Sequence, residues 1–244
     1  MMRLRSLAGA LIGLMLAMGS GHSQDFGMVM FNDSIDLTNS YVAQSAMVSV
    51  ANANAKANAR RPGSTAGKKA LRTLGFRSDP AVSAKVKARF RSQLVQSNPA
   101  QAAIVDAALK ADWLKGYGAE IARPNGLDAR NLADAYTAYL VASWALVNNV
   151  ETLSARSIKA VRDTMRAAMI ADPKISRMTD GQKQEVAEDL IYNTVLVMAN
   201  RIHISKSGDA SLQHSAAKNY GDLFQKQGID LAALTLTEGG FVRR

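Results

Sequence analysis

One stretch near the middle of the chain restricts the fold more than any other, because it carries no charge over residues 135–150: AYTAYLVASWALVNNV. Its 16 residues, bounded by Asp134 and Glu151, are too few to cross a bilayer core, which takes about 20. Tyr, Leu, Trp and Val side chains share one broad face, and alanines occupy the others. A helix that is apolar or small on every side must be surrounded by protein, so this stretch predicts the centre of a helical bundle.

Signals for helix ends predict further helices on both sides of this stretch. Asp79 and Pro80 are typical of an N-cap and a first helical position, and Thr179 with Gln182 has the spacing of a capping box. Another helix is expected to end at Asp172, since the residue before a proline resists the α conformation. The predicted helices span residues 78–96, 98–116, 126–148, 154–172, 179–204 and 209–228, with a last short helix over 230–236.

Composition divides the chain into three parts. Residues 1–23 have Arg3 and Arg5, then an apolar run of about 12 residues, then small polar residues, which is the layout of a secretory signal peptide. Residues 24–77 are low in complexity and contain an Ala-, Asn- and Gly-rich segment, and they predict a flexible basic linker. Residues 78–244 predict an all-α fold, a single bundle-like domain of about six or seven helices.

The leader predicts an exported protein, periplasmic or extracellular. Cleavage is expected after Ser23 or after Gly21, and an uncleaved membrane anchor is the alternative. The chain contains no cysteine, which excludes disulfides and a lipid anchor attached through cysteine. The stability of the fold is therefore expected to come from its core.

Positive charge is concentrated in one part of the chain. Residues 56–91 carry eleven basic residues and one acidic residue, whereas residues 92–244 carry 17 basic and 16 acidic residues. The net charge of +10 thus resides almost wholly in one basic stretch beside an electrically balanced body. Such asymmetry is typical of a segment that meets an anionic partner, or of a soluble spacer.

Nine cations of the basic stretch are predicted to contact an anionic partner, either an unknown protein or an envelope component. Four of them flank the apolar stripe of the first predicted helix, a layout that suits an anionic membrane surface and equally a helix that docks on a protein core. No aromatic residue lies between residues 48 and 75, so specific nucleic-acid recognition is not expected. The nine cations are Arg60, Arg61, Lys68, Lys69, Arg72, Lys85, Lys87, Arg89 and Arg91.

The segment ARRPGSTAGKK has the composition of a phosphate-binding loop but not its spacing. Three residues separate Gly63 from Gly67, where the motif needs four. Lys69 stands where the motif needs a Ser or Thr hydroxyl for magnesium. The segment is therefore predicted to be part of the linker, and no nucleotide cofactor is expected.

No catalytic, cofactor or metal site is predicted. His203 and His214 are the histidines of the helical domain, without an H-E-x-x-H motif or a cysteine pair. No G-x-S-x-G motif marks a nucleophile. Glu185, Glu188 and Asp189 cluster in the first turns of their helix, where acids favour the helix dipole, and they are expected on its polar side.

Four segments carry a resemblance to a known family: SDPAVSAKVKARF, GLDARNLADAYTAYLVASW, GQKQEVAEDLIYNTVLVMA and GIDLAALTLTEGGF. Together they resemble a family of exported bacterial domains of unknown function, over about residues 76–242. The resemblance implies an exported helical domain. It brings no activity and no site residues with it.

Two functions remain open at this point. The first is a non-enzymatic binding or interaction module with electrostatic attraction to an anionic partner. The alternative is a hydrolase of an envelope polymer, with carboxylates from Glu120, Asp128 or Glu188. Its cleft would be lined by aromatic residues, namely Tyr136, Tyr139, Trp144 and Tyr192.

Overall fold

The central helix predicted from the sequence is present and fully enclosed. The computed structural model describes residues 73–97 and 99–244, and α8 spans Leu132–Val147. Every residue of α8 except the last is buried, and the Asn131 side chain caps its first turn by accepting from the amides of Ala133 and Asp134. Of the helices described, none has the length and apolar character to pass through a bilayer.

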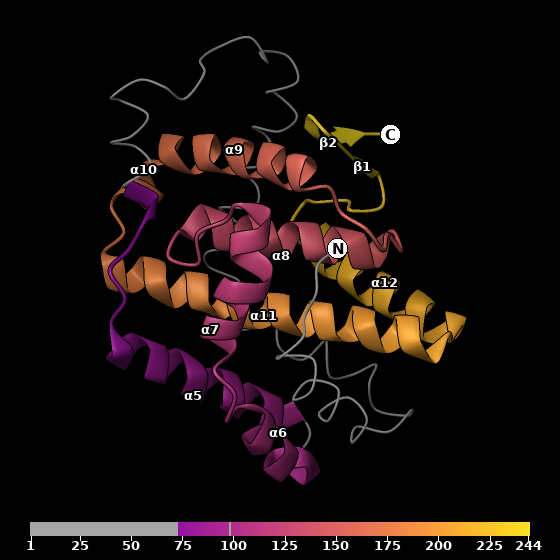
Figure 1. The fold of residues 1–244 in the computed structure, drawn as a ribbon, viewed down its shortest axis with the longest axis horizontal. Helices are drawn as coiled ribbons and strands as arrows, with labels where there is room; N and C mark the ends of the chain where they lie inside the picture. Colours follow the sequence, from indigo (N-terminus) through magenta and orange to yellow (C-terminus); the bar gives the residue numbers. More distant parts are fainter. Residues whose placement is uncertain (1–72, 98) are drawn as a thin grey trace.

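The other long helices lie in layers around α8 (Figure 1). Helix α11, Asp180–Ser207, lies between α8 and α5, Pro80–Ser97, and contacts both. Helix α9, Ala155–Ala171, covers the opposite side of α8, and α12, Ala210–Lys226, packs against α8 near its end. The described part of the chain is mostly helical, so the predicted all-α, bundle-like domain is confirmed.

Three of the predicted helix boundaries, those at Asp79, at Asp172 and at Thr179, are confirmed. The Asp79 carboxylate accepts from the Ala81 amide at 2.8 Å, and Thr179 and Gln182 form a reciprocal capping box. Asp172 has an extended backbone, which ends α9 and begins the short helix α10, Pro173–Ser176.

The single helix predicted over residues 98–116 is wrong. The chain instead forms η2, Pro99–Gln101, then α6, Ala102–Ala108, and after a turn α7, Trp113–Tyr117. Asp112 starts α7 because its side chain accepts from the Lys115 amide at 3.0 Å. The irregular turns that follow are η3, Gly118–Ala122, and η4, Arg123–Asn125.

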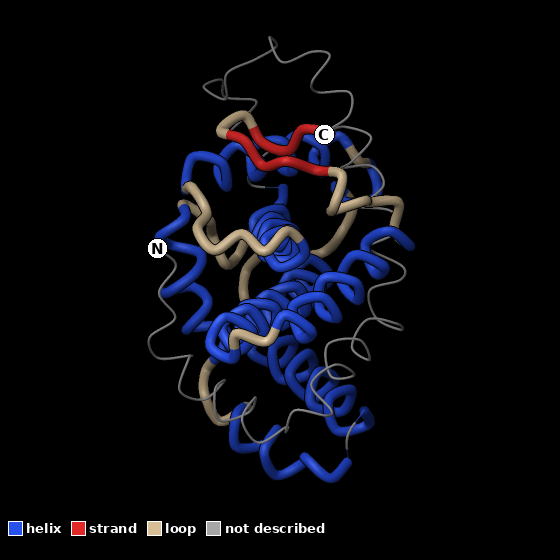
Figure 2. Tube along the Cα trace, turned by 90° about the vertical axis from the view of Figure 1, so that its right-hand side faces the viewer, coloured by secondary structure: helices blue, strands red, loops and turns tan. Residues whose placement is uncertain are grey.

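The short helix predicted over residues 230–236 is also wrong, because this end of the chain forms an antiparallel hairpin (Figure 2). Strand β1, Leu234–Thr237, pairs with β2, Gly240–Arg243, and Gly240 adopts a φ of +103° in the turn. The hairpin is fixed to α8 by Trp144, whose indole N–H donates to the Leu234 carbonyl at 3.0 Å.

Residues 73–77, assigned to the linker by their composition, lie against the helical domain. Leu74 is fully buried, and the Phe76 amide donates to the Arg130 carbonyl at 3.1 Å. The Lys183 amino group donates to the carbonyls of Thr73 and Gly75 at 3.2 and 2.8 Å. The predicted signal peptide and the linker up to residue 72 lie outside the described residues.

Candidate functional site

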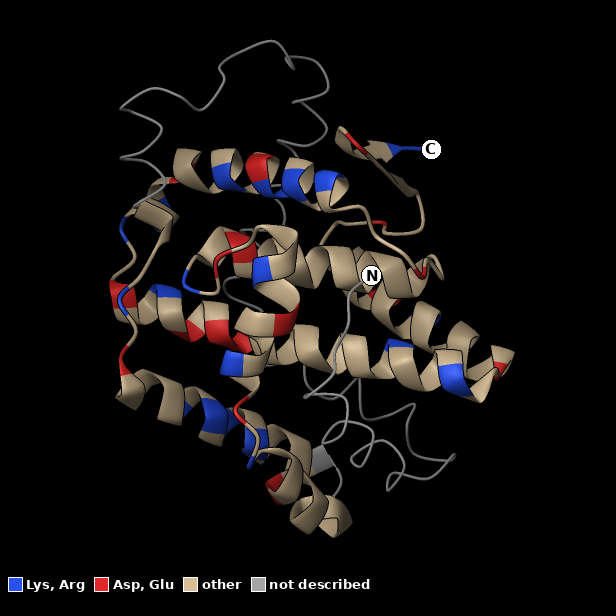
Figure 3. Ribbon diagram, in the orientation of Figure 1, with Lys and Arg blue, Asp and Glu red and all other residues tan. Residues whose placement is uncertain are grey.

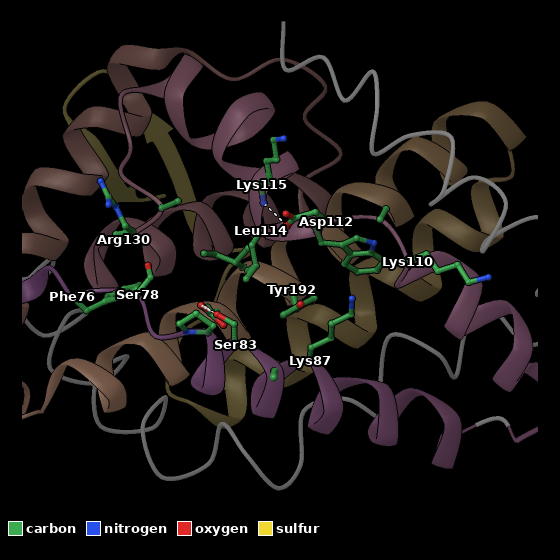
Figure 4. A pocket seen from close by; sticks show the side chains of 17 residues that line it. Phe76, Ser78, Ser83, Lys87, Lys110, Asp112, Leu114, Lys115, Arg130 and Tyr192 are labelled. Carbon is green, nitrogen blue, oxygen red and sulfur yellow. Dashed lines mark hydrogen bonds between the residues drawn. The ribbon is translucent and has the colours of Figure 1, made fainter.

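A cavity of about 640 Å³ lies where α5, α7 and the first half of α11 meet. Phe76, Ser78, Ala129 and Arg130 complete its lining (Figure 4). This volume falls within the range of about 300–1,000 Å³ that is typical of small-molecule sites. The residues that line it come from four separate parts of the chain.

Two helices supply facing walls through side chains at helical spacing. Helix α5 contributes four residues at positions i, i+3, i+4 and i+7, and α11 contributes three at i, i+3 and i+4. Such spacings place each set on one face of its helix. The two sets are Pro80, Ser83, Ala84 and Lys87 on α5, and Glu188, Ile191 and Tyr192 on α11.

An aromatic cluster supports the wall behind the cavity. The ring of Phe90 lies 4.6 Å from that of Tyr192 and 5.7 Å from that of Trp113, measured between ring centroids. Trp113 and Tyr192 both line the cavity, whereas Phe90 is buried behind them. The indole N–H of Trp113 donates to the Ala108 carbonyl at 3.0 Å, which fixes the ring in the turn before α7.

Four exposed cations stand around the cavity: Lys87, Lys110, Lys115 and Arg130. Figure 4 shows the charged ends of Lys110, Lys115 and Arg130 directed outward, and Lys87 rising from α5 on the side of Tyr192. Within the described residues, none of the four is paired with an acid at salt-bridge distance. These four residues are called the rim cations below.

The cations predicted from the sequence lie in different environments in the structure. Lys85 and Arg89 pair with Glu185, and Arg89 pairs with Asp189 as well. Figure 3 shows these basic residues of α5 facing acidic residues of α11. One edge of α5 is thus used to dock the helix on the domain.

The other basic residues predicted to contact a partner include one that is paired with an acid, one at the rim of the cavity and five outside the described residues. Arg91 pairs with Asp106, the distance between Nη2 and Oδ2 being 2.8 Å. Lys87 is a rim cation. The other five predicted contacts lie outside the described residues: Arg60, Arg61, Lys68, Lys69 and Arg72.

The expectation that the acidic cluster of α11 lies on a polar, solvated side is wrong for two of its three members. The Glu188 residue is 5% exposed and the Asp189 side chain 13% exposed, because α5 packs over this side of α11. Burial raises the pKa of Asp189 to about 6, and the Arg89 guanidinium offsets only part of this effect. Glu185 accepts a hydrogen bond from the same guanidinium, and this bond holds the pKa of Glu185 below its ordinary value.

Glu188 is the one acidic residue of this cluster that lines the cavity. Its Oε1 accepts from the Ser83 hydroxyl at 2.7 Å and from the Gln184 side-chain amide at 2.8 Å. Its Oε2 is buried and has no hydrogen-bond donor within the described residues. Burial raises the pKa of Glu188, against the effect of these two neutral donors.

The aromatic cleft of the hydrolase alternative does not form from the four predicted residues. Tyr136, Tyr139 and Trp144 are buried in the core and contribute nothing to the cavity wall, whereas Tyr192 lines it. Of the three predicted carboxylates, Glu188 alone lines the cavity.

The two histidines within the described residues do not contribute to this cavity either. His203 is half-buried on α11 and His214 is exposed on α12, and neither lines it. Among the residues that the structure describes, no three or more His, Cys, Asp or Glu gather in a way that could hold a metal ion.

Sequence reasoning missed Lys110, Lys115 and Arg130. Lys110 and Arg130 lie in turns and Lys115 lies in the five-residue helix α7, and in such short segments a lone cation carries no pattern. They lie around one cavity because α5, the start of α7 and residues 129–130 line it together, which is a long-range feature. The spacing Ser83, Ala84, Lys87 was visible in the sequence, but it did not indicate what would face it.

A comparison with protein families gives one match. A family model described as a family of unknown function (DUF6683) matches residues 7–244. The chain belongs to this family. The resemblance to a family of unknown function is confirmed, and the DUF6683 match is longer than the expected residues 76–242. No match was found among curated proteins or among solved structures.

In this DUF6683 family member, Asp189 is expected to make the unfolding free energy fall between about pH 4 and pH 7. Its pKa is raised to about 6, so the folded state binds this proton more tightly than the unfolded state. Below pH 4 both states are protonated. Above pH 6 the folded state must hold a buried carboxylate, and a difference of about two pKa units corresponds to roughly 3 kcal/mol.

Urea unfolding of the wild type and of Asp189→Asn at four pH values checks this expectation. The stability of the wild type relative to the variant should decrease by roughly 3 kcal/mol from pH 4 to pH 7. Other titrating groups, including Glu185, are common to both chains. A difference that stays constant with pH would contradict the assignment.

Proposed function

We propose that this family member is a non-enzymatic binding module that attracts an anionic partner to the cavity. The observation that carries the proposal is the set of rim cations, four exposed positive charges around one cavity with no acid at salt-bridge distance within the described residues. Cations gathered at a concave surface raise the local concentration of anions and accelerate their association.

The basic stretch upstream fits the same proposal. Residues 56–72 add six positive charges and no negative charge to the chain just before the described residues. The leader is the basis for the second part of the proposal, that the protein is exported and meets its partner in the periplasm or outside the cell. An anionic envelope component or an anionic protein surface fits both features.

The composition of the cavity favours binding over hydrolysis. The Ser83 hydroxyl donates to the Glu188 carboxylate, but no histidine stands between the two groups as it does in a serine hydrolase triad. The lining contains no histidine, and Asp112, its other acid, caps α7. A hydrolase is therefore not the function we propose.

The proposal predicts binding that depends on the rim cations. The triple variant Lys87→Ala, Lys110→Ala, Lys115→Ala should bind an anionic probe about tenfold more weakly at low salt, because three attractive charges are lost. A matched control removes three exposed lysines elsewhere and should change the affinity less than threefold. The control substitutions are Lys159→Ala, Lys206→Ala and Lys226→Ala.

Fluorescence titration with three probes makes the measurement: dextran sulfate, phosphatidylglycerol vesicles and single-stranded polythymidine. The mature wild-type chain should bind at least one of them, with affinity falling as salt rises. Equal losses in the two triple variants would show unspecific charge attraction, and no binding to any probe at low salt would overturn the proposal. A companion deletion should remove residues 56–72 and keep Leu74, which belongs to the core.

A further inference from the structure

We propose that the cavity binds a small zwitterion, with its amino group against Glu188 and its anionic group among the rim cations. The inference rests on the proposed function for the anionic end of the ligand. It adds the chemistry of the other end, and with it the ligand class: a free amino acid or a short peptide with free termini.

The first step is the unsatisfied oxygen of Glu188. A carboxylate accepts through both oxygens, but Oε2 has no donor within the described residues although it is buried. Buried polar atoms are nearly always hydrogen-bonded, so an unpaired acceptor on a residue that lines the cavity indicates a donor that comes from outside the chain. The i+4 neighbour Tyr192 places a phenol on the same wall.

The second step is the missing positive charge. The two donors to Glu188 are the neutral side chains of Ser83 and Gln184. Arg89, a cation on the same helix as Ser83, directs its guanidinium to Glu185 and Asp189 instead. A buried carboxylate is stabilised most by a cation that also donates hydrogen bonds, and a ligand ammonium group supplies both.

The third step is the arrangement of charge across the cavity. The buried negative group lies on the α11 wall, and the exposed positive groups lie around the opening. Asp112, the other acid of the lining, is exposed, and its side chain caps α7. A simple anion would pair with the rim cations and leave Glu188 without a cationic partner, whereas a zwitterion supplies an opposite charge to both regions.

The fourth step is size and polarity. A cavity of about 640 Å³ is adequate for a ligand of this class. The lining also includes Trp113, Leu114 and Ile191, which offer apolar contact to an aliphatic or aromatic side chain. The site therefore favours a zwitterion with an apolar side chain over a strongly hydrated one.

The test uses the mature wild-type chain and three forms of one pooled dipeptide library: free termini, N-acetylated and C-amidated. Equilibrium dialysis with mass spectrometry measures which dipeptides are retained. The free pool should be retained, and N-acetylation should weaken retention at least tenfold because the ammonium group is lost. Amidation should also weaken it, through the rim cations. Sodium glucuronate serves as a probe with a carboxylate and hydroxyls but no amino group.

Two variants assign the effect to Glu188. Glu188→Gln keeps the size of the side chain and should remove the preference for the free over the N-acetylated pool. Glu185→Gln makes the same change of charge on the same helix outside the cavity, and it should keep that preference. Circular dichroism checks that both variants are folded. The N-acetylated pool tests the role of the dipeptide amino group with the wild-type protein, without any substitution.

The outcomes separate this inference from the proposed function. Equal retention of free and acetylated pools, retention of glucuronate but of no dipeptide, or no retention at all would overturn the zwitterion inference. If the triple rim variant still weakens binding of the anionic probes, the proposed function stands without it. If those probes do not bind either, the proposed function fails as well.

Discussion

Replacing Arg166 with leucine is expected to lower the unfolding free energy by about 3–5 kcal/mol. Its partner Asp134 is fully buried on α8 and accepts from Arg166 through both oxygens, at 2.7 Å to Nε and 2.6 Å to Nη2. The Asp128 amide adds a third hydrogen bond at 2.8 Å. Without the guanidinium, an ionised carboxylate would remain in the core with one backbone donor, and this penalty exceeds the loss of the pair itself.

The control is an exposed ion pair of the same helix. Arg156 pairs with Glu238, and their side chains are 74% and 66% exposed, so Arg156→Leu should leave stability nearly unchanged. The double variant Asp134→Asn, Arg166→Leu should recover part of the loss, because the buried charge is gone. Urea unfolding followed by circular dichroism measures all four chains. If Arg166→Leu costs no more than Arg156→Leu, the buried pair does not hold α9 to α8 as described.

The elements that could be predicted from the sequence are those whose signal is local. The charge-free stretch of α8 leaves it no stable position except the centre, and the capping box at Thr179 and Gln182 sits within four residues. The beginning and the end of the helical domain are harder to predict from the sequence. A short apolar run such as residues 230–236 suits a helix or a strand, and the pairing of residues 234–237 with residues 240–243 decides for the strand.

The site could not be predicted from the sequence because its residues come together only when the helices pack. Glu188 and Asp189 have the pattern of a solvated acidic face until α5, about 100 residues earlier in sequence, covers them. The nine basic candidates are predicted from the charge density of the basic stretch and, for the four on α5, from their position beside its apolar stripe. Charge density along the chain does not distinguish Lys87, a rim cation, from Arg89, whose guanidinium pairs with an acid of α11 where α5 docks. Lys110, Lys115 and Arg130 carry no local pattern, and tertiary structure alone gathers them.

The second large effect is expected from Phe90→Ala, which should lower the unfolding free energy by about 3–5 kcal/mol. Phe90 is almost fully buried, and its ring contacts those of Trp113 and Tyr192, so it joins α5 to α7 and α11 at once. Removing the ring leaves a space that the surrounding helices can only partly close. Phe90→Leu retains most of the volume and should cost less than about 1.5 kcal/mol.

The same two variants connect core packing to binding. Phe90 lies behind the cavity rather than in it, whereas Trp113 and Tyr192 form its wall. If the wall depends on this support, Phe90→Ala should weaken retention of the free dipeptide pool although every lining residue is unchanged, and Phe90→Leu should weaken it much less. Urea unfolding and the dialysis measurement, made on the same samples below the unfolding transition, give the two quantities. A variant that loses stability and keeps full retention would show that the wall holds its shape without Phe90, and that binding depends on the charged groups at its two ends.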